Sequence, residues 1–217
     1  MTTLLRVDAS LRQEGSVSRA LADSAEAAWK AEHPDGVVIR RDLGQHPLPA
    51  TAWPALVAVK LGAEPGPDHA EAAALAAEIS AEVRKADAVL LAVPLYNYGI
   101  AQHVKTWIDL LFTDPEMAYG PSPVAGRPAI LTLARGGGYS PGAPKHGWDY
   151  ATPYLERIFG DSLGMKVRVA AAELTLAPVT PGMEQLIDAS KVSETEAHAT
   201  AEQHGAQVAR ELIANVA

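Results

Sequence analysis

Hydrophobic and polar positions along this chain form short apolar runs separated by amphipathic segments. The apolar runs predict five strands, at residues 4–9, 37–43, 88–93, 128–135 and 166–174. The third run contains no polar residue, which is typical of a central strand buried on both faces. The second run carries two arginines, which indicates a strand at the edge of the sheet.

The segments that follow these runs have a helical pattern. Ile100, Val104, Trp107 and Leu111 recur at the spacing of one apolar face of a helix. Ser18 is the predicted N-cap of the first helix. The predicted helices cover residues 18–33, 68–85, 100–111, 152–163 and 190–215. Two proline-containing stretches, residues 44–67 and 112–127, are predicted to be irregular, and the first is a candidate pocket wall.

Strands that alternate with helices predict an α/β fold with a parallel, doubly wound sheet and right-handed crossovers. Five strands with this spacing favour the order 2-1-3-4-5 over a six-stranded dinucleotide-binding fold. The length of 217 residues is consistent with a single domain over residues 1–217. In such a sheet the loops after strands one, three and four emerge at the same carboxyl edge, so they can form one site.

Composition narrows the class of protein. Eighteen basic and 26 acidic residues give a net charge of −8, which repels nucleic acid, so no nucleic-acid partner is expected. The chain has no cysteine, which excludes disulfides, thiolate metal sites and cysteine nucleophiles. No apolar stretch approaches the roughly 18 residues of a membrane span. We therefore expect a soluble, cytoplasmic protein that does not bind a membrane.

The loop after the first strand, residues 10–18, is rich in serine and leads directly into a helix. We call it the serine loop. Free backbone N–H groups and the helix dipole favour an anion there, and the hydroxyls of Ser10, Ser16 and Ser18 add donors. A monophosphate is the natural occupant, because neither a Gly-Lys-Ser/Thr end nor a G-x-G-x-x-G pattern is present. A solvated loop with a capping serine is the alternative.

Two further loops emerge at the same edge. The tyrosine turn, residues 95–99, carries Tyr96, Asn97 and Tyr98 on a short connection that can lay a planar ring against backbone. The glycine loop, residues 135–139, has three consecutive glycines, which allow positive φ and a close approach of backbone to a flat ligand. Each loop alone could be a plain connection. Together with a monophosphate site they predict a pocket for flavin mononucleotide, FMN.

These residues resemble those of the FMN-dependent NADH-azoreductases, also described as NADH:quinone reductases, which have the flavodoxin-like fold. The resemblance covers nearly the whole chain, and its most specific part is residues 94–100 together with 105–109. It implies non-covalent FMN, a homodimer with the active site at the subunit boundary, and two-electron reduction of quinones or azo compounds by NADH or NADPH. The cofactor-binding residues implied are Ser10, Ser16, Val17, Ser18, Pro94, Leu95, Tyr96, Asn97, Tyr98, Arg135, Gly136, Gly137, Gly138 and Tyr139.

The chain departs from this family between residues 112 and 126. Relatives usually have a Gly-x-Thr-Phe-x-Tyr pattern there, whereas this chain has Phe112 followed by Thr-Asp-Pro-Glu-Met-Ala and Tyr119. Since this segment shapes the substrate mouth in such enzymes, Tyr119 is a candidate mouth residue. No catalytic side chain is expected, because the flavin carries the redox chemistry. Alternating binding of nicotinamide and acceptor on the same flavin face predicts ping-pong kinetics.

The sequence can be compared with three other functional classes. Gly160-x-Ser162-x-Gly164 matches the hydrolase pattern, with Asp188 and His198 downstream, but a helix rather than a strand is predicted before the serine. A flavodoxin-like FMN electron carrier without its own turnover is the main alternative function. No metal site is expected, because the seven histidines lack a paired spacing. Asp8, in the first strand, has no role that the sequence explains.

Overall fold

The computed structural model describes residues 1–214 and contains a five-stranded parallel sheet with the order β2-β1-β3-β4-β5. The strands are β1 (Thr3–Asp8), β2 (Val37–Asp42), β3 (Ala88–Pro94), β4 (Pro128–Ala134) and β5 (Lys166–Ala172). The predicted order is confirmed, as are the edge position of β2 and the complete burial of β3. All four neighbouring pairs are parallel, so the carboxyl ends of the strands meet at one edge.

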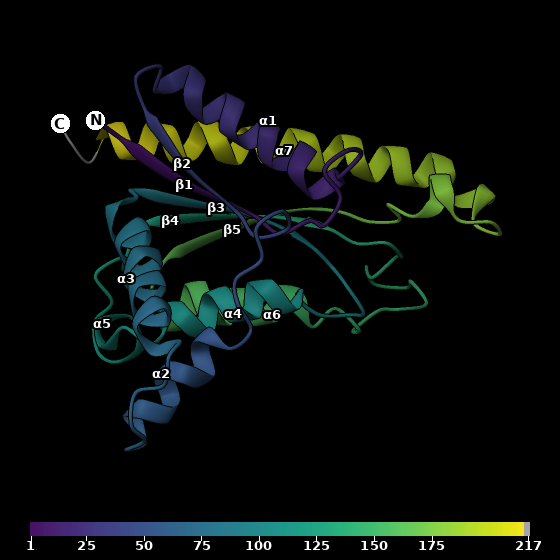
Figure 1. The fold of residues 1–217 in the computed structure, drawn as a ribbon. Helices are drawn as coiled ribbons and strands as arrows, with labels where there is room; N and C mark the ends of the chain where they lie inside the picture. The colour runs from purple at the N-terminus through teal and green to yellow at the C-terminus, as the bar shows by residue number, and fades with distance from the viewer. Residues whose placement is uncertain (215–217) are drawn as a thin grey trace.

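Helices cover both faces of the sheet (Figure 1). On one face lie α1 (Val17–Glu32) and α7 (Ile187–Ala214), which pack against each other. On the other lie α3 (His69–Lys85), α4 (Gln102–Leu111) and α6 (Ala151–Glu156), the last continued by a π-helical segment, Arg157–Ser162. Short 3₁₀ turns at Ala177–Val179 and Glu184–Leu186 precede α7. No helix within residues 1–214 is both long and apolar enough to span a membrane.

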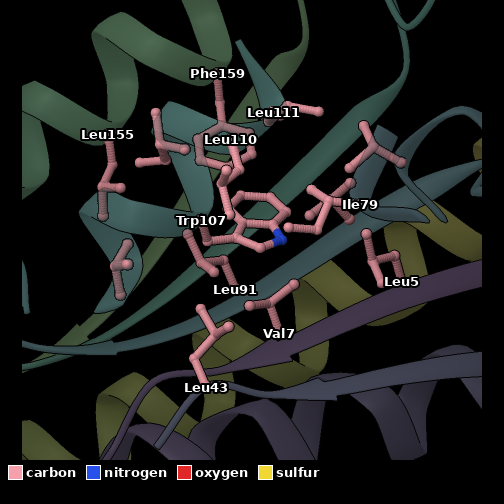
Figure 2. Close-up of a cluster of buried hydrophobic side chains, with 14 of the residues drawn as sticks. Leu5, Val7, Leu43, Ile79, Leu91, Trp107, Leu110, Leu111, Leu155 and Phe159 are labelled. Carbon is pink, nitrogen blue, oxygen red and sulfur yellow. The ribbon is translucent and has the colours of Figure 1, made fainter. Parts of the chain in front are cut away.

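The larger core lies between the sheet and the α3–α4–α6 layer, around Trp107 (Figure 2). The fully buried Trp107 ring stacks on Phe159 with ring centroids 6.2 Å apart and planes 17° apart. Leu5, Val7 and Leu91 approach from the strands. The apolar face predicted for residues 100–111 is confirmed, since Val104, Trp107, Ile108 and Leu111 are all buried. This core anchors α4 and thereby the turn that precedes it.

Several predicted boundaries were wrong. The N-cap of α1 is Ser16 rather than Ser18. The stretch 44–67 is not fully irregular, because it contains α2 (Ala52–Lys60); Pro54 is tolerated there since first-turn N–H groups have no intrahelical partner. The stretch 112–127 likewise contains the short α5 (Pro115–Ala118). The last helix begins three residues early, at Ile187, and the end predicted at residue 215 lies outside the described residues.

Candidate functional site

The serine loop forms a small cavity at the N-terminus of α1. Ser10, Ser16 and Ser18 are all buried, and the Ser16 and Ser18 hydroxyl oxygens lie 3.4 Å apart. Ser16 caps the helix by position, but its hydroxyl accepts no capping hydrogen bond from the first turn. The cavity has a volume of about 120 Å³ and is lined by all three serines, Arg12 and Val17. Polar donors and a helix N-terminus therefore converge on a space large enough for a small anion.

The tyrosine turn is a tight two-residue reversal. Tyr96 and Gly99 exchange two backbone hydrogen bonds of 3.0 Å, and Asn97 and Tyr98 have φ of +48° and +69°. Two central residues with positive φ are the mark of a type I′ turn. A bulky residue such as tyrosine is rare in this conformation. The Tyr98 carbonyl accepts a 2.9 Å hydrogen bond from the Tyr150 amide, which helps hold the turn in place.

Side chains also secure the tyrosine turn. The Tyr98 ring packs edge-to-face on Trp148, with centroids 5.4 Å apart, and the Lys145 ammonium lies 5.4 Å from the Tyr98 centroid. On the other side, the Tyr96 hydroxyl accepts a 3.3 Å hydrogen bond from the Leu11 amide in the serine loop. The two loops predicted to share a site are thus directly connected.

The glycines of the glycine loop provide space rather than an unusual backbone angle. Three consecutive glycines allow positive φ, but none of Gly136, Gly137 and Gly138 adopts it. A Cβ atom on Gly136 would instead lie 2.6 Å from the Leu176 side chain. Because backbone N–H groups of residues 174–176 donate to carbonyls of residues 135–137, the loop after β5 lies against the glycine loop.

A second, larger cavity of about 750 Å³ opens between these loops. Its wall combines the tyrosine turn, the glycine loop and the segments around residues 143–145 and 173–186. The large cavity shares Leu95, Gly136 and Leu176 with the small cavity. The two spaces therefore adjoin, with the buried serines at one end and flat, partly aromatic walls at the other. Burial in this wall raises the pKa of Tyr139, with a further contribution from Tyr98.

Arg135 supports the glycine loop from behind and lines neither cavity. Its guanidinium contacts Asp149 at 2.8 Å and Glu173 at 3.0 Å. Glu173 also accepts a 2.8 Å hydrogen bond from the Tyr139 amide. Arg135 thus ties together the two chain segments that flank the large cavity, whereas Pro94, Leu95, Asn97 and the glycines form its surface or that of the small cavity.

A sequence model of the flavodoxin-like fold family matches residues 2–210. The chain belongs to the flavodoxin-like family. Its curated relatives include an FMN-dependent NADH:quinone oxidoreductase of Streptomyces avermitilis, 37% identical over 201 residues that cover 91% of this chain and 93% of that protein. Another, from Kineococcus radiotolerans, is 41% identical over 192 residues, covering 86% of this chain and 90% of that protein. The crystal structure of an azoreductase from Bacillus anthracis matches with a TM-score of 0.77 and 26% identity, covering 95% of this chain and 100% of that one.

The candidate mouth residue Tyr119 and most of the candidate pocket wall lie away from the two cavities. Tyr119 is 81% exposed and directly follows α5. The α5 helix lies on the side of the molecule where the strands begin (Figure 1). Tyr119 lines neither of the two cavities. The stretch 44–67 does form a pocket wall, but α2 lines a separate cavity of about 330 Å³ against α3. Within one copy of the chain, neither Tyr119 nor α2 lines the two carboxyl-edge cavities.

Sequence reasoning missed one loop of the site. Residues 174–176 follow β5 and line both cavities in part, and Leu174 has a φ of +59°. The topology could have indicated this segment, because the loop after strand five also emerges at the carboxyl edge. Arg12 was also missed as a lining residue of the small cavity.

The hydrolase interpretation is not supported by the geometry around Ser162. This residue ends the π-helical segment, Gly164 follows with a φ of +67°, and β5 comes next. A nucleophile elbow needs a strand before the serine and a helix after it. His198, the candidate base, is instead bonded through Nδ1 to the Ser24 hydroxyl at 2.7 Å.

The contacts of Glu173 predict that the stability of the fold depends on pH. Burial alone would raise the pKa of Glu173, but hydrogen bonds from Tyr139, Ser140 and Arg135 lower it below its ordinary 4.5. A lowered folded-state pKa stabilises the fold above the ordinary value, and this contribution is lost as the pH falls through the lowered one. We expect Glu173→Gln to reduce the urea midpoint at pH 7, and we expect this difference from the parent protein to shrink as the pH is lowered. Glu196→Gln, on the exposed surface of α7, is the control; a gap that persisted unchanged at pH 3 would contradict the expectation.

Proposed function

We propose that this protein is an FMN-dependent oxidoreductase that uses NADH or NADPH for the two-electron reduction of quinones and azo compounds, with ping-pong kinetics. The observation that carries the proposal is the pair of adjoining cavities at the carboxyl edge. The small one suits a phosphate group and the large one a flat ring with space for a second planar molecule. The printed names of the relatives describe the same chemistry.

The residues of the small cavity fit a phosphate monoester. Ser18 is fully buried, and within residues 1–214 its hydroxyl has the Ser16 hydroxyl as its one hydrogen-bond partner. Both hydroxyls can therefore donate to an anion in the cavity without breaking a stronger bond. Arg12 adds a positive charge at its rim, and the dipole of α1 acts in the same direction.

The walls of the large cavity fit the flavin ring system. Within residues 1–214, the backbone N–H groups of Asn97, Gly137 and Gly138 donate to no acceptor of the chain. Unpaired donors on a cavity wall are costly unless a ligand or water accepts from them. We assign these three donors to the polar edge of the ring, where they would stabilise negative charge.

When bound, FMN supplies the redox chemistry by taking two electrons from the nicotinamide and passing them to the acceptor. The chain binds the phosphate through the serine loop and orients the ring through the tyrosine turn. The glycine loop would direct fixed N–H groups at the ring, and Tyr98, which packs against Trp148, would form part of the wall beside it.

The decisive experiment is a spectrum of the purified protein followed by steady-state kinetics. We expect flavin absorbance, or stoichiometric FMN binding on titration, together with oxidation of NADH in the presence of a quinone. Parallel lines in double-reciprocal plots would support the ping-pong order. FMN binding without turnover would favour the electron carrier, and no FMN binding at all would overturn the proposal.

The assembly and location are also proposals. The resemblance to the azoreductases implies a homodimer. The chain length favours single-domain subunits, and the cytoplasmic location is the one expected from the sequence. The expected role of Tyr119 at the substrate mouth would require a second subunit, because Tyr119 is exposed and lines neither cavity of its own chain. Light scattering on the purified protein tests it, with a monomer mass as the contradicting result.

The position of Lys145 in the large cavity predicts that the protein prefers anionic electron acceptors. Lys145 lines the large cavity and, among the described residues, makes no ion pair. We expect Lys145→Met to raise the KM of a sulfonated azo dye by about fivefold, corresponding to roughly 1 kcal/mol for a partly exposed charge pair. The KM of an uncharged quinone should change less than about twofold. Equal increases for both acceptors would show that Lys145 acts through packing alone.

A further inference from the structure

Arg19 of α1 reaches back over the serine loop and binds it at two points. Its Nη2 donates to the Ser10 carbonyl at 2.7 Å, and its Nε donates to the Arg12 carbonyl at 3.1 Å. These two carbonyls lie on either side of Leu11, in the part of the loop that leaves β1. One side chain thereby sets the path of the backbone that carries Ser10.

The orientation of Arg19 is itself set by Asp42, the last residue of β2. The guanidinium and the carboxylate form a two-point pair, with Nη1–Oδ2 and Nη2–Oδ1 distances of 2.7 Å each. Only 12% of the Arg19 side chain and 22% of that of Asp42 are exposed. Asp42 also accepts a 2.9 Å hydrogen bond from the Gln45 amide. Such bidentate pairs are directional, so the fork of Arg19 has little freedom.

Gly44 allows this arrangement to form. A Cβ atom at this position would lie 2.0 Å from the Ser10 carbonyl oxygen, a distance that no side chain could adopt without moving the loop. The Leu43 and Gly44 amides donate to the Asp8 carbonyl at 2.8 and 3.3 Å. The segment after β2 is thus pressed against the start of the serine loop.

Arg19 does not serve as a ligand of the anion. It lines neither cavity, and its donors are directed at two carbonyls and at Asp42, which balances its charge. The serine hydroxyls and the N-terminus of α1 remain the groups that face the small cavity. Arg19 therefore acts on the anion through the loop, not by contact.

We propose that Arg19 and Asp42 are positioning residues that hold the Ser10–Arg12 backbone in its anion-binding path before FMN arrives, and so set the affinity for the phosphate group and not for the ring. This inference rests on the proposed function. A loop already in its bound conformation loses less conformational entropy on binding. Removing the Arg19–Asp42 pair leaves every phosphate contact available in principle but no longer assembled in advance.

The test compares FMN with riboflavin, which has the same ring and no phosphate. Apo-protein is titrated with each flavin, and Kd is measured from the quenching of flavin fluorescence, for the parent protein and for Arg19→Gln, Arg19→Lys and Asp42→Asn. Arg40→Gln is the matched control, because Arg40 lies on β2 beside Asp42 and is likewise paired with a carboxylate. Its side chain is 53% exposed, and its partner is Glu26 of α1 rather than the serine loop.

We expect Arg19→Gln to weaken FMN binding by about 10- to 100-fold, the range for losing hydrogen bonds from a charged group. Riboflavin affinity should change less than about twofold. The ratio of the riboflavin Kd to the FMN Kd should therefore fall by nearly as much as the FMN Kd rises. Arg19→Lys should be intermediate, since lysine keeps the charge without the fork. Asp42→Asn should also weaken FMN binding more than riboflavin binding, and Arg40→Gln should bind both flavins like the parent protein.

Equal weakening of FMN and riboflavin would overturn the inference, because it would indicate a general loss of structure. Unchanged FMN binding in Arg19→Gln and Asp42→Asn would overturn it too, because the loop would then be positioned without the pair. Failure of the parent protein to bind either flavin would instead contradict the proposed function, so the two failures can be told apart.

Discussion

Replacing Arg6 by methionine is expected to lower the free energy of unfolding by about 3–5 kcal/mol, the range for breaking a buried ion pair from one side. Arg6 lies in β1 and is only 3% exposed. Its guanidinium contacts Asp8 at 3.0 Å, Asp23 at 2.6 Å and Glu26 at 3.0 Å. Burial alone would lower the pKa of Arg6, but Asp8 and the other two carboxylates raise it, so the group stays charged. Methionine would remove the buried cation between Asp8 and Glu26, leaving Asp8 with Arg19 at 3.8 Å and Glu26 with the exposed Arg40.

The measurement is thermal and urea unfolding of Arg6→Met beside Arg40→Met. Arg40 pairs with the same Glu26 but its side chain is 53% exposed, so its loss should cost no more than about 1 kcal/mol. For a protein of this size, the Arg6 variant should melt roughly 6–20 °C lower. Arg6→Lys should lose less, because it keeps the charge. Equal effects of the two methionine variants would show that burial adds nothing to this cluster.

The Arg6 cluster also shows where sequence reasoning stopped. The run of residues 4–9 correctly predicts a strand, because apolar residues dominate it and burial follows from that pattern. The same pattern does not show that Arg6 and Asp8 are buried together. The other partners of Arg6, Asp23 and Glu26, come from a helix and lie 17 and 20 residues further along the chain. Pairing of this kind depends on how α1 packs on the sheet. Asp8 therefore had no explanation until the structure placed it beside Arg6 and Arg19.

The candidate site was predictable to the extent that topology determines it. Parallel strands in the order 2-1-3-4-5 bring the serine loop, the tyrosine turn and the glycine loop to one edge, and the structure confirms that they meet there. Details that depend on local geometry were not accessible. Gly136 serves close packing against Leu176, and positive φ occurs instead at Asn97 and Tyr98. Arg135, which directly follows β4, is a cofactor-binding candidate by sequence. In the structure it forms ion pairs with Asp149 and Glu173, which support the glycine loop from outside the cavities.

Removing the two adjacent hydroxyls of the small cavity is expected to abolish tight FMN binding. Each hydrogen bond to a charged group contributes about 1.5–3 kcal/mol, so Ser16→Ala combined with Ser18→Ala should weaken FMN by roughly a hundredfold or more. Both side chains are buried, and within residues 1–214 each hydroxyl has the other, at 3.4 Å, as its one hydrogen-bond partner. Alanine at both positions therefore leaves no other group without a partner. Stability should therefore change little, in contrast to Arg6→Met.

Riboflavin and a control on the same helix separate a phosphate effect from a general one. Ser24→Ala removes a hydroxyl of α1 that is bonded to His198 and is remote from the cavity, so FMN affinity should stay within about twofold of the parent. Riboflavin should bind the double variant as it binds the parent. Because the cavity loses hydroxyl donors but keeps the helix N-terminus and Arg12, residual FMN binding should become more sensitive to salt. Undiminished FMN affinity in the double variant would place the phosphate elsewhere and leave the serine loop as a helix cap alone.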